Sequence, residues 1–129
     1  MPGPTFVATP LPWAATLSAA NPNRDGTGTL VNVVPGGSGL GSRVDTIRLI
    51  ATGAVTAGVI RLFLQDGSAN KYLFKEVLVP ATVPSTIIET WTRDLTYADG
   101  LPIPNGWTLR AATHNAETFN VIARGGNFT

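Results

Sequence analysis

Hydrophobic and polar positions alternate in short runs from Trp13 to the end of the chain, and turn residues separate the runs. No run keeps a helical period, so the pattern predicts β-strands and leaves almost no room for helices. In the clearest run Ile60, Leu62 and Leu64 share one face, which is typical of a sheet buried on one side. Eight strands are predicted, at Trp13–Ala19, Thr29–Val34, Arg43–Ala51, Gly58–Gln65, Lys71–Val79, Thr86–Tyr97, Trp107–Thr113 and Thr118–Arg124.

Turn residues fill the gaps between these runs. Asp66 and Gly67 predict the tip of a β-hairpin, and Asp99-Gly100 and Asn105-Gly106 also favour tight turns. The glycine-rich stretch from Pro35 to Ser42 predicts a flexible surface loop. Residues 13–129 are therefore expected to form one all-β domain, an eight-stranded antiparallel sandwich of jelly-roll type, with an immunoglobulin-like sandwich as the alternative.

The first 12 residues include four prolines, which forbid a helix and disfavour a central strand. We expect residues 1–12 to form an extended N-terminal arm, although a sheet edge or a frayed end would fit the same composition. An extended arm can add a strand to the sheet edge of a neighbour through main-chain hydrogen bonds. The candidate interface residues in this arm are Thr5, Phe6, Val7 and Ala8.

The strand predicted at Thr86–Tyr97 has no purely apolar face, because Ile87 and Trp91 lie on the same face as Glu89 and Arg93. A strand of this kind suits a sheet edge or a subunit interface. Trp91 and Arg93 are therefore two further candidate interface residues.

The composition points to a partly covered surface. Charged residues make up 13% of the chain, about half the usual proportion, and 43% of residues are apolar. A surface so poor in charge favours a protein covered in part by partners or by copies of itself. The net charge of +1 is spread without blocks, which argues against a nucleic-acid partner. With no apolar run of about 20 residues, no membrane segment is expected, and we expect a soluble protein made in the cytoplasm.

Motifs that would indicate an enzyme, a cofactor or a metal are missing from the sequence. The only histidine, His114, is expected in a hairpin turn between the last two strands, and the chain has no cysteine. Asn23, Asp25 and Thr27 start a calcium-loop pattern, but the bidentate glutamate that it requires is absent. The stretch Gly36–Gly41 fits neither a phosphate-binding loop nor a dinucleotide fingerprint. We therefore expect a protein that is not an enzyme and needs no cofactor.

Aromatic residues leave one further alternative open. Trp13, Trp91 and Trp107, with Tyr72 and Tyr97, would suit a sugar-stacking platform, but core or interface packing is the more usual role of large aromatic side chains. A carbohydrate-binding sandwich module therefore stays as an alternative function.

The stretch from Asn105 to Gly126, with the sequence NGWTLRAATHNAETFNVIARGG, resembles the ending of small virion proteins of tailed bacteriophages. The rest of the chain shares their style, with a proline-bearing N-terminal arm, few charges and no cysteine. The resemblance implies a virion structural protein, made in the host cytoplasm and present at the capsid surface. It implies a capsid decoration or cement protein that binds the major capsid protein, often as a homotrimer. A head-fibre, tail or host-attachment component is the alternative from the same source.

Overall fold

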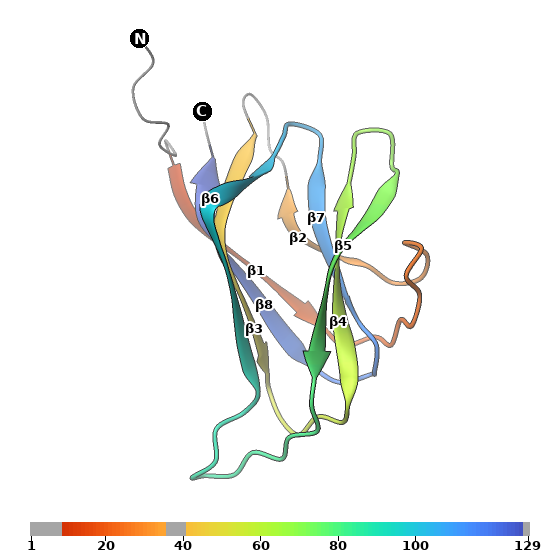
Figure 1. Cartoon of the computed structure of the whole chain (residues 1–129), viewed down its shortest axis with the longest axis vertical. Helices are drawn as coiled ribbons and strands as arrows, with labels where there is room; N and C mark the ends of the chain where they lie inside the picture. Colours follow the sequence, from red (N-terminus) through yellow and green to blue (C-terminus); the bar gives the residue numbers. More distant parts are fainter. Residues whose placement is uncertain (1–8, 36–40, 128–129) are drawn as a thin grey trace.

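The computed structural model describes residues 9–35 and 41–127, which form a sandwich of two four-stranded antiparallel sheets (Figure 1). Its described residues contain eight strands and no helix, which confirms the predicted all-β class and strand number. The strands are β1 (Thr9–Leu17), β2 (Val31–Pro35), β3 (Ser42–Ala51), β4 (Gly58–Gln65), β5 (Lys71–Val79), β6 (Thr92–Ile103), β7 (Thr108–Thr113) and β8 (Phe119–Asn127).

The strand order is β1-β8-β3-β6 in one sheet and β2-β7-β4-β5 in the other. Only β4 and β5 are neighbours both in the sequence and in a sheet, and they form the hairpin that Asp66-Gly67 predicts. Every other connection passes from one sheet to the other. His114, expected in a hairpin, therefore lies instead in a crossover between β7 and β8.

The two sheets enclose one main hydrophobic core. Inward-facing Ile60 and Leu62 of β4 belong to the same buried cluster as Ile47 and Leu49 of β3, on the opposite sheet. The predicted alternation in β4 is thus confirmed for its inner face. The alternating residues Trp107, Leu109 and Ala111 also contact this core.

The first strand begins earlier than expected. β1 starts at Thr9 and pairs with β8 up to Thr9↔Asn127, so residues 9–12, assigned to the arm, belong to the sheet. Pro10 and Pro12 are tolerated because β1 is an edge strand, where a missing N–H donor need not interrupt a second ladder. Residues 1–8, the remainder of the predicted arm, lie outside the described residues, as does the loop segment 36–40.

The sixth strand begins later than expected, at Thr92 instead of Thr86. Ser85 closes a turn before it, because the Ser85 hydroxyl accepts hydrogen bonds from the amides of Ile87 (3.2 Å) and Ile88 (3.1 Å). Local side-chain hydrogen bonds of this kind compete with strand pairing. The prediction that this strand lies at a sheet edge is confirmed, whereas Asp99-Gly100 lies inside β6, at a bulge opposite β3, instead of in a turn between strands.

Candidate assembly surfaces

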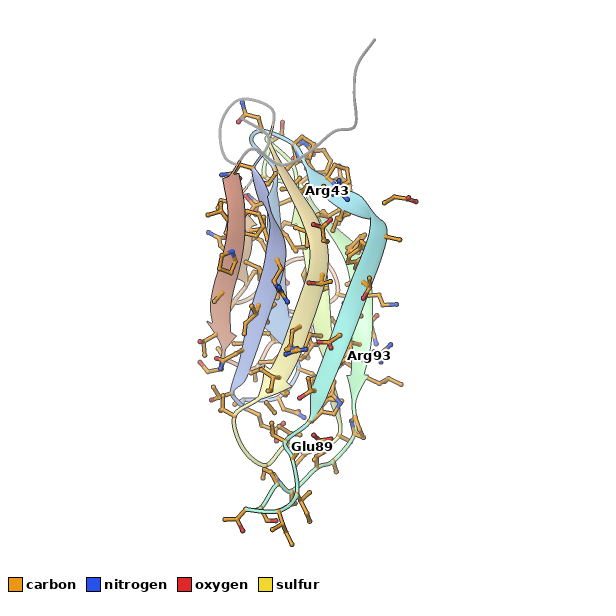
Figure 2. All side chains as sticks on the ribbon, turned by 90° about the vertical axis from the view of Figure 1, so that its left-hand side faces the viewer. Arg43, Glu89 and Arg93 are labelled. Atoms are coloured by element: carbon orange, nitrogen blue, oxygen red, sulfur yellow. The ribbon has the colours of Figure 1, made fainter. Side chains whose placement is uncertain are left out.

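The predicted interface residues do not gather into one site. Thr5, Phe6, Val7 and Ala8 fall outside the described residues. Trp91 immediately precedes β6, is half-buried and makes a T-shaped contact with Phe119 at 5.9 Å, so part of its surface serves the core. Arg93 is exposed on the edge strand β6 (Figure 2). An interface role for these residues stays a prediction.

The outer face of the β2-β7-β4-β5 sheet is covered in part by the chain itself. The connection from β1 to β2, residues 18–30, lies on it and buries a second small cluster of Leu30, Phe63 and Ala112. Arg110 donates from a guanidinium NH₂ to the carbonyl of Leu30 at 2.9 Å. The amide of Asn21 donates to the carbonyl of Thr113 at 2.8 Å, which ties the start of the connection to β7. These contacts cover the part of this face over β7 and β4, whereas Leu78 of β5 stays exposed.

Arg61 is the most buried charged residue of this covered face, with 2% of its surface exposed. One NH₂ nitrogen of its guanidinium donates to the carbonyl of Asn21 and to Nδ1 of His114, both at 3.3 Å. Since a guanidinium can only donate, His114 accepts at Nδ1 and carries its ring proton on Nε2. Nε of Arg61 lies 3.6 Å from Oε2 of Glu76. Arg24 binds the other carboxylate oxygen of Glu76 at 2.8 Å. These contacts join the covering connection to the sheet.

The hydrogen bond from Arg24 is the main cause that holds the pKa of Glu76 below its ordinary value. The carboxylate therefore stays ionised between two guanidinium groups. Among residues 9–35 and 41–127, no group of three or more histidine, aspartate or glutamate residues lies close enough to hold a metal ion. The cluster around Arg61 is thus explained by its contacts within the fold.

The outer face of the β1-β8-β3-β6 sheet, by contrast, has no covering segment among the described residues; Figure 2 looks onto it. We call it the open face. Its side chains form three rows across the four strands. From β1 to β6 the rows are Pro12, Arg124, Thr46, Thr96; Ala14, Ile122, Arg48, Asp94; and Thr16, Asn120, Ile50, Thr92.

Charge on the open face is nearly cancelled. Arg48 binds Asp94 through two hydrogen bonds, of 2.8 Å and 3.2 Å. The hydrogen bond from Arg48 holds the pKa of Asp94 below its usual value, so the pair stays ionised and neutral overall. Arg124 has no hydrogen-bond or ion-pair partner within the described part of the chain. The other positions carry small, polar or aliphatic side chains, and this scarcity of charge is a property of the covered centre of an interface.

Two adjoining grooves cross the open face and share Thr46 and Arg124. The larger has a volume of about 570 Å³ and the smaller about 180 Å³. The larger groove, named the β1-β8-β3 groove below, is lined by Leu11, Pro12, Asp45, Thr46, Arg124 and Gly125. Its lining is more apolar than polar, with a carboxylate that already pairs with Arg43 at 2.8 Å.

A second exposed apolar surface lies on the connection between β5 and β6, residues 80–91, named the β5–β6 loop. Ile87 is 92% exposed at its tip, Val83 is 74% exposed, and Leu78 at the adjoining end of β5 is also 74% exposed. The segment from Val77 to Ile88 carries no charged side chain and contains two prolines. This uncharged run is visible in the sequence, but the β-branched residues at 86–88 favour a strand by composition, and the structure forms a turn there.

The described residues include no helix long and apolar enough to cross a membrane. The sequence matches no protein-family model, and it has no significant match among curated proteins.

Proposed function

We propose that this protein is a structural component of a bacteriophage virion, namely a capsid decoration or cement protein that stabilises contacts between major capsid subunits. The observation that carries the proposal is the open face of the β1-β8-β3-β6 sheet. Residues 18–30 cover part of one sheet, whereas the other presents an uncovered, grooved surface with one neutral ion pair and one free guanidinium. A cement protein gains its effect from many modest contacts of this kind and needs no reactive group.

The finer architecture that we propose is a jelly roll. Supporting this assignment, the chain alternates between the two sheets at every connection except β4–β5, and its first and last strands are neighbours in one sheet. An eight-stranded double sheet of this order is the arrangement expected from two Greek keys. In this arrangement one outer face is partly covered by residues 18–30 and the other is open, which suits a protein that contacts a shell through one face.

The resemblance of residues 105–126 to phage virion proteins supports the partner and the location that we propose. The partner is the major capsid protein, the location is the capsid surface, and the protein is a homo-oligomer, with a trimer favoured by that resemblance. We propose neither a catalytic role nor a nucleic-acid or membrane partner. The even spread of nine basic and eight acidic residues agrees with this choice.

Placing a charge in the middle of the open face should weaken capsid binding. Ala14 is exposed in the central row, next to Ile122, so Ala14→Lys would put an unpaired ammonium into the contact. We expect occupancy of particles that lack the native protein to fall about tenfold at subsaturating concentration. Ser68→Lys, which adds the same charge at the exposed tip of the β4–β5 hairpin, is the matched control. Equal occupancy for both variants, measured by quantitative gel analysis of purified particles, would refute the use of this face.

Removing residues 2–8 should lower oligomerisation and capsid occupancy if Thr5–Ala8 pair with a neighbour. The deletion stops before Thr9 because residues 9–12 pair with β8, and their loss would damage the sheet itself. Light scattering and particle binding are the measurements. Unchanged mass and unchanged occupancy would exclude a role for this segment.

The position of the protein on the particle separates the main proposal from its closest alternative. Regular density over the shell in images of particles with and without the protein supports decoration, whereas density at the tail alone supports a tail or attachment component. The carbohydrate-binding alternative has less support, because Trp13, Trp91 and Trp107 all pack against the hydrophobic core.

A further inference from the structure

The tip of the β5–β6 loop is an exposed apolar turn closed by local hydrogen bonds. Ser85 and Ile88 exchange backbone hydrogen bonds of 3.0 Å and 3.4 Å, and the Ser85 hydroxyl accepts from two amides of the same turn. The turn presents Ile87 and Ile88 side by side in sequence, with the acidic Glu89 directly after them. Glu89 is exposed and has no hydrogen-bond or ion-pair partner among the residues that the structure describes. An exposed apolar tip of this kind is expected to bind a concave apolar site.

The β1-β8-β3 groove has the complementary properties. It is concave, mainly apolar and about 570 Å³ in volume, which is ample for two aliphatic side chains. Gly125 contributes no side chain to its lining, and Leu11 and Pro12 supply apolar side chains. Its charged rim includes Arg124, which lacks a partner within the described residues. The groove therefore combines a mainly apolar lining with one free positive charge, and the tip combines two apolar side chains with one free negative charge.

The tip and the groove lie at opposite ends of the sandwich. The groove lies where β1 and β3 begin and β8 ends, at the top of Figure 1, while the β5–β6 loop projects beyond the strands at the bottom. Figure 2 shows Glu89 at that lower end, beyond the open face. One copy therefore cannot place its tip in its own groove, and a contact between these two surfaces must join two copies.

We propose that the β5–β6 loop of one copy inserts Ile87 and Ile88 into the β1-β8-β3 groove of the next, with Glu89 paired to Arg124 of that copy. The opposite charges of Glu89 and Arg124 and the apolar character of both surfaces select a second copy of this chain as the occupant. Such a contact joins two different surfaces and is heterologous, so repetition produces a closed ring or an open filament. The inference rests on the proposed multi-copy role and assigns its self-association to named surfaces.

The size of the contact predicts its strength. A loop tip in a groove covers less than the ~800 Å² per partner of a standard interface, so each contact should be weak and association should depend on concentration. A cyclic or shell-bound arrangement makes such contacts effective, because the repeated sites hold neighbouring tips and grooves at high local concentration. The two lower rows of the open face, which contain Ala14 and Thr16, remain available for the shell.

Complementation between two variants tests the proposal. Ile87→Lys removes the tip, and Thr46→Arg fills the groove beside Arg124 with a like charge. We expect sedimentation velocity to show concentration-dependent oligomers for the native chain and at least tenfold weaker association for each variant alone. An equimolar mixture of the variants should form a dimer and nothing larger, because the mixture retains one intact tip and one intact groove. Leu73→Lys, an exposed apolar residue elsewhere on β5, is the control and should associate as the native chain does.

Three outcomes would overturn the proposal. They are a native chain that stays monomeric at all concentrations, a groove variant that still associates, and a mixture that yields no dimer. The last would mean that the tip meets another tip, residues 1–8 or a different protein. If Thr46→Arg fails to fold, Arg124→Glu replaces it, and Glu89→Arg combined with Arg124→Glu should restore the association that either change lowers. The sedimentation experiment contains no capsid particles, so its result is independent of the capsid binding that Ala14→Lys tests. Self-association can fail while capsid binding holds, and capsid binding can fail while self-association holds.

Discussion

Replacing Gly125 by alanine should lower the free energy of unfolding by about 3 kcal/mol, one of the two largest effects expected in this chain. Gly125 lies in β8 where its ladder with β3 is interrupted by a bulge between Val44 and Thr46. A Cβ atom there would lie 1.9 Å from the carbonyl oxygen of Arg43 and 3.0 Å from Cα of Val44. Both are backbone atoms of the neighbouring strand, so no side-chain rotation relieves the clash, and the two strands must separate.

Gly53→Ala is the matched control for this change. An added Cβ at Gly53 meets no atom within 4 Å, and its backbone is outside the left-handed region. The control should leave the urea midpoint almost unchanged, or raise it slightly through the lower entropy of the unfolded chain. Equal midpoints for Gly125→Ala and Gly53→Ala would show that β3 and β8 are not in the close contact described. Because Gly125 also lines the groove, its variants test stability only.

Replacing Arg61 by alanine should also cost about 3 kcal/mol of unfolding free energy. Arg61 is among the largest fully buried side chains, and truncation would leave a cavity beneath residues 18–30. It would also deprive the carbonyl of Asn21 and Nδ1 of His114 of their donor. The covering connection would lose its main polar contact with β4, so protease cleavage within residues 18–30 should accelerate together with the fall in the urea midpoint.

Arg61→Met separates volume from charge in this prediction. Methionine fills much of the same space but, like alanine, leaves the acceptors on Asn21 and His114 without their donor. We expect Arg61→Met to cost about 2 kcal/mol, less than alanine because it leaves a smaller cavity. If methionine and alanine prove equally destabilising, the hydrogen bonds decide the effect and the cavity does not. A midpoint unchanged in both would contradict the account of Arg61 given above.

Local patterns were sufficient to predict most strands. Gly58–Gln65 and Lys71–Val79 were predicted with the observed ends, because their alternation is regular and Asp66-Gly67 joins them in a hairpin. The stretch Thr86–Ile88 has the composition of a strand but no strand to pair with, and the hydroxyl of Ser85 closes a turn there instead. β6 begins at Thr92, where Ile50 of β3 becomes available as a partner.

The candidate surfaces were harder to predict from the sequence than the strands. Low charge predicts a surface covered by partners or by copies of the chain, and it does not indicate which face the chain covers by itself and which it leaves open. Arg61 and Phe63 alternate as outward-facing residues of β4, and both are buried because residues 18–30 fold back over them. Trp91, expected at an interface, contacts Phe119 from a distant part of the chain.

The sequence by itself determined the all-β class, the number of strands and the β4–β5 hairpin, since each depends on residues close together in the chain. Tertiary structure alone decided the strand order, the covered and open faces, and the separation of the apolar tip at Ile87 from the groove at Arg124. Those features depend on pairings such as β1 with β8, whose partners are more than a hundred residues apart for Thr16 and Asn120. A two-residue alternation indicates which side of a strand is buried, but several strand pairings bury that side equally well. Only the packing of the whole chain determines which pairing forms.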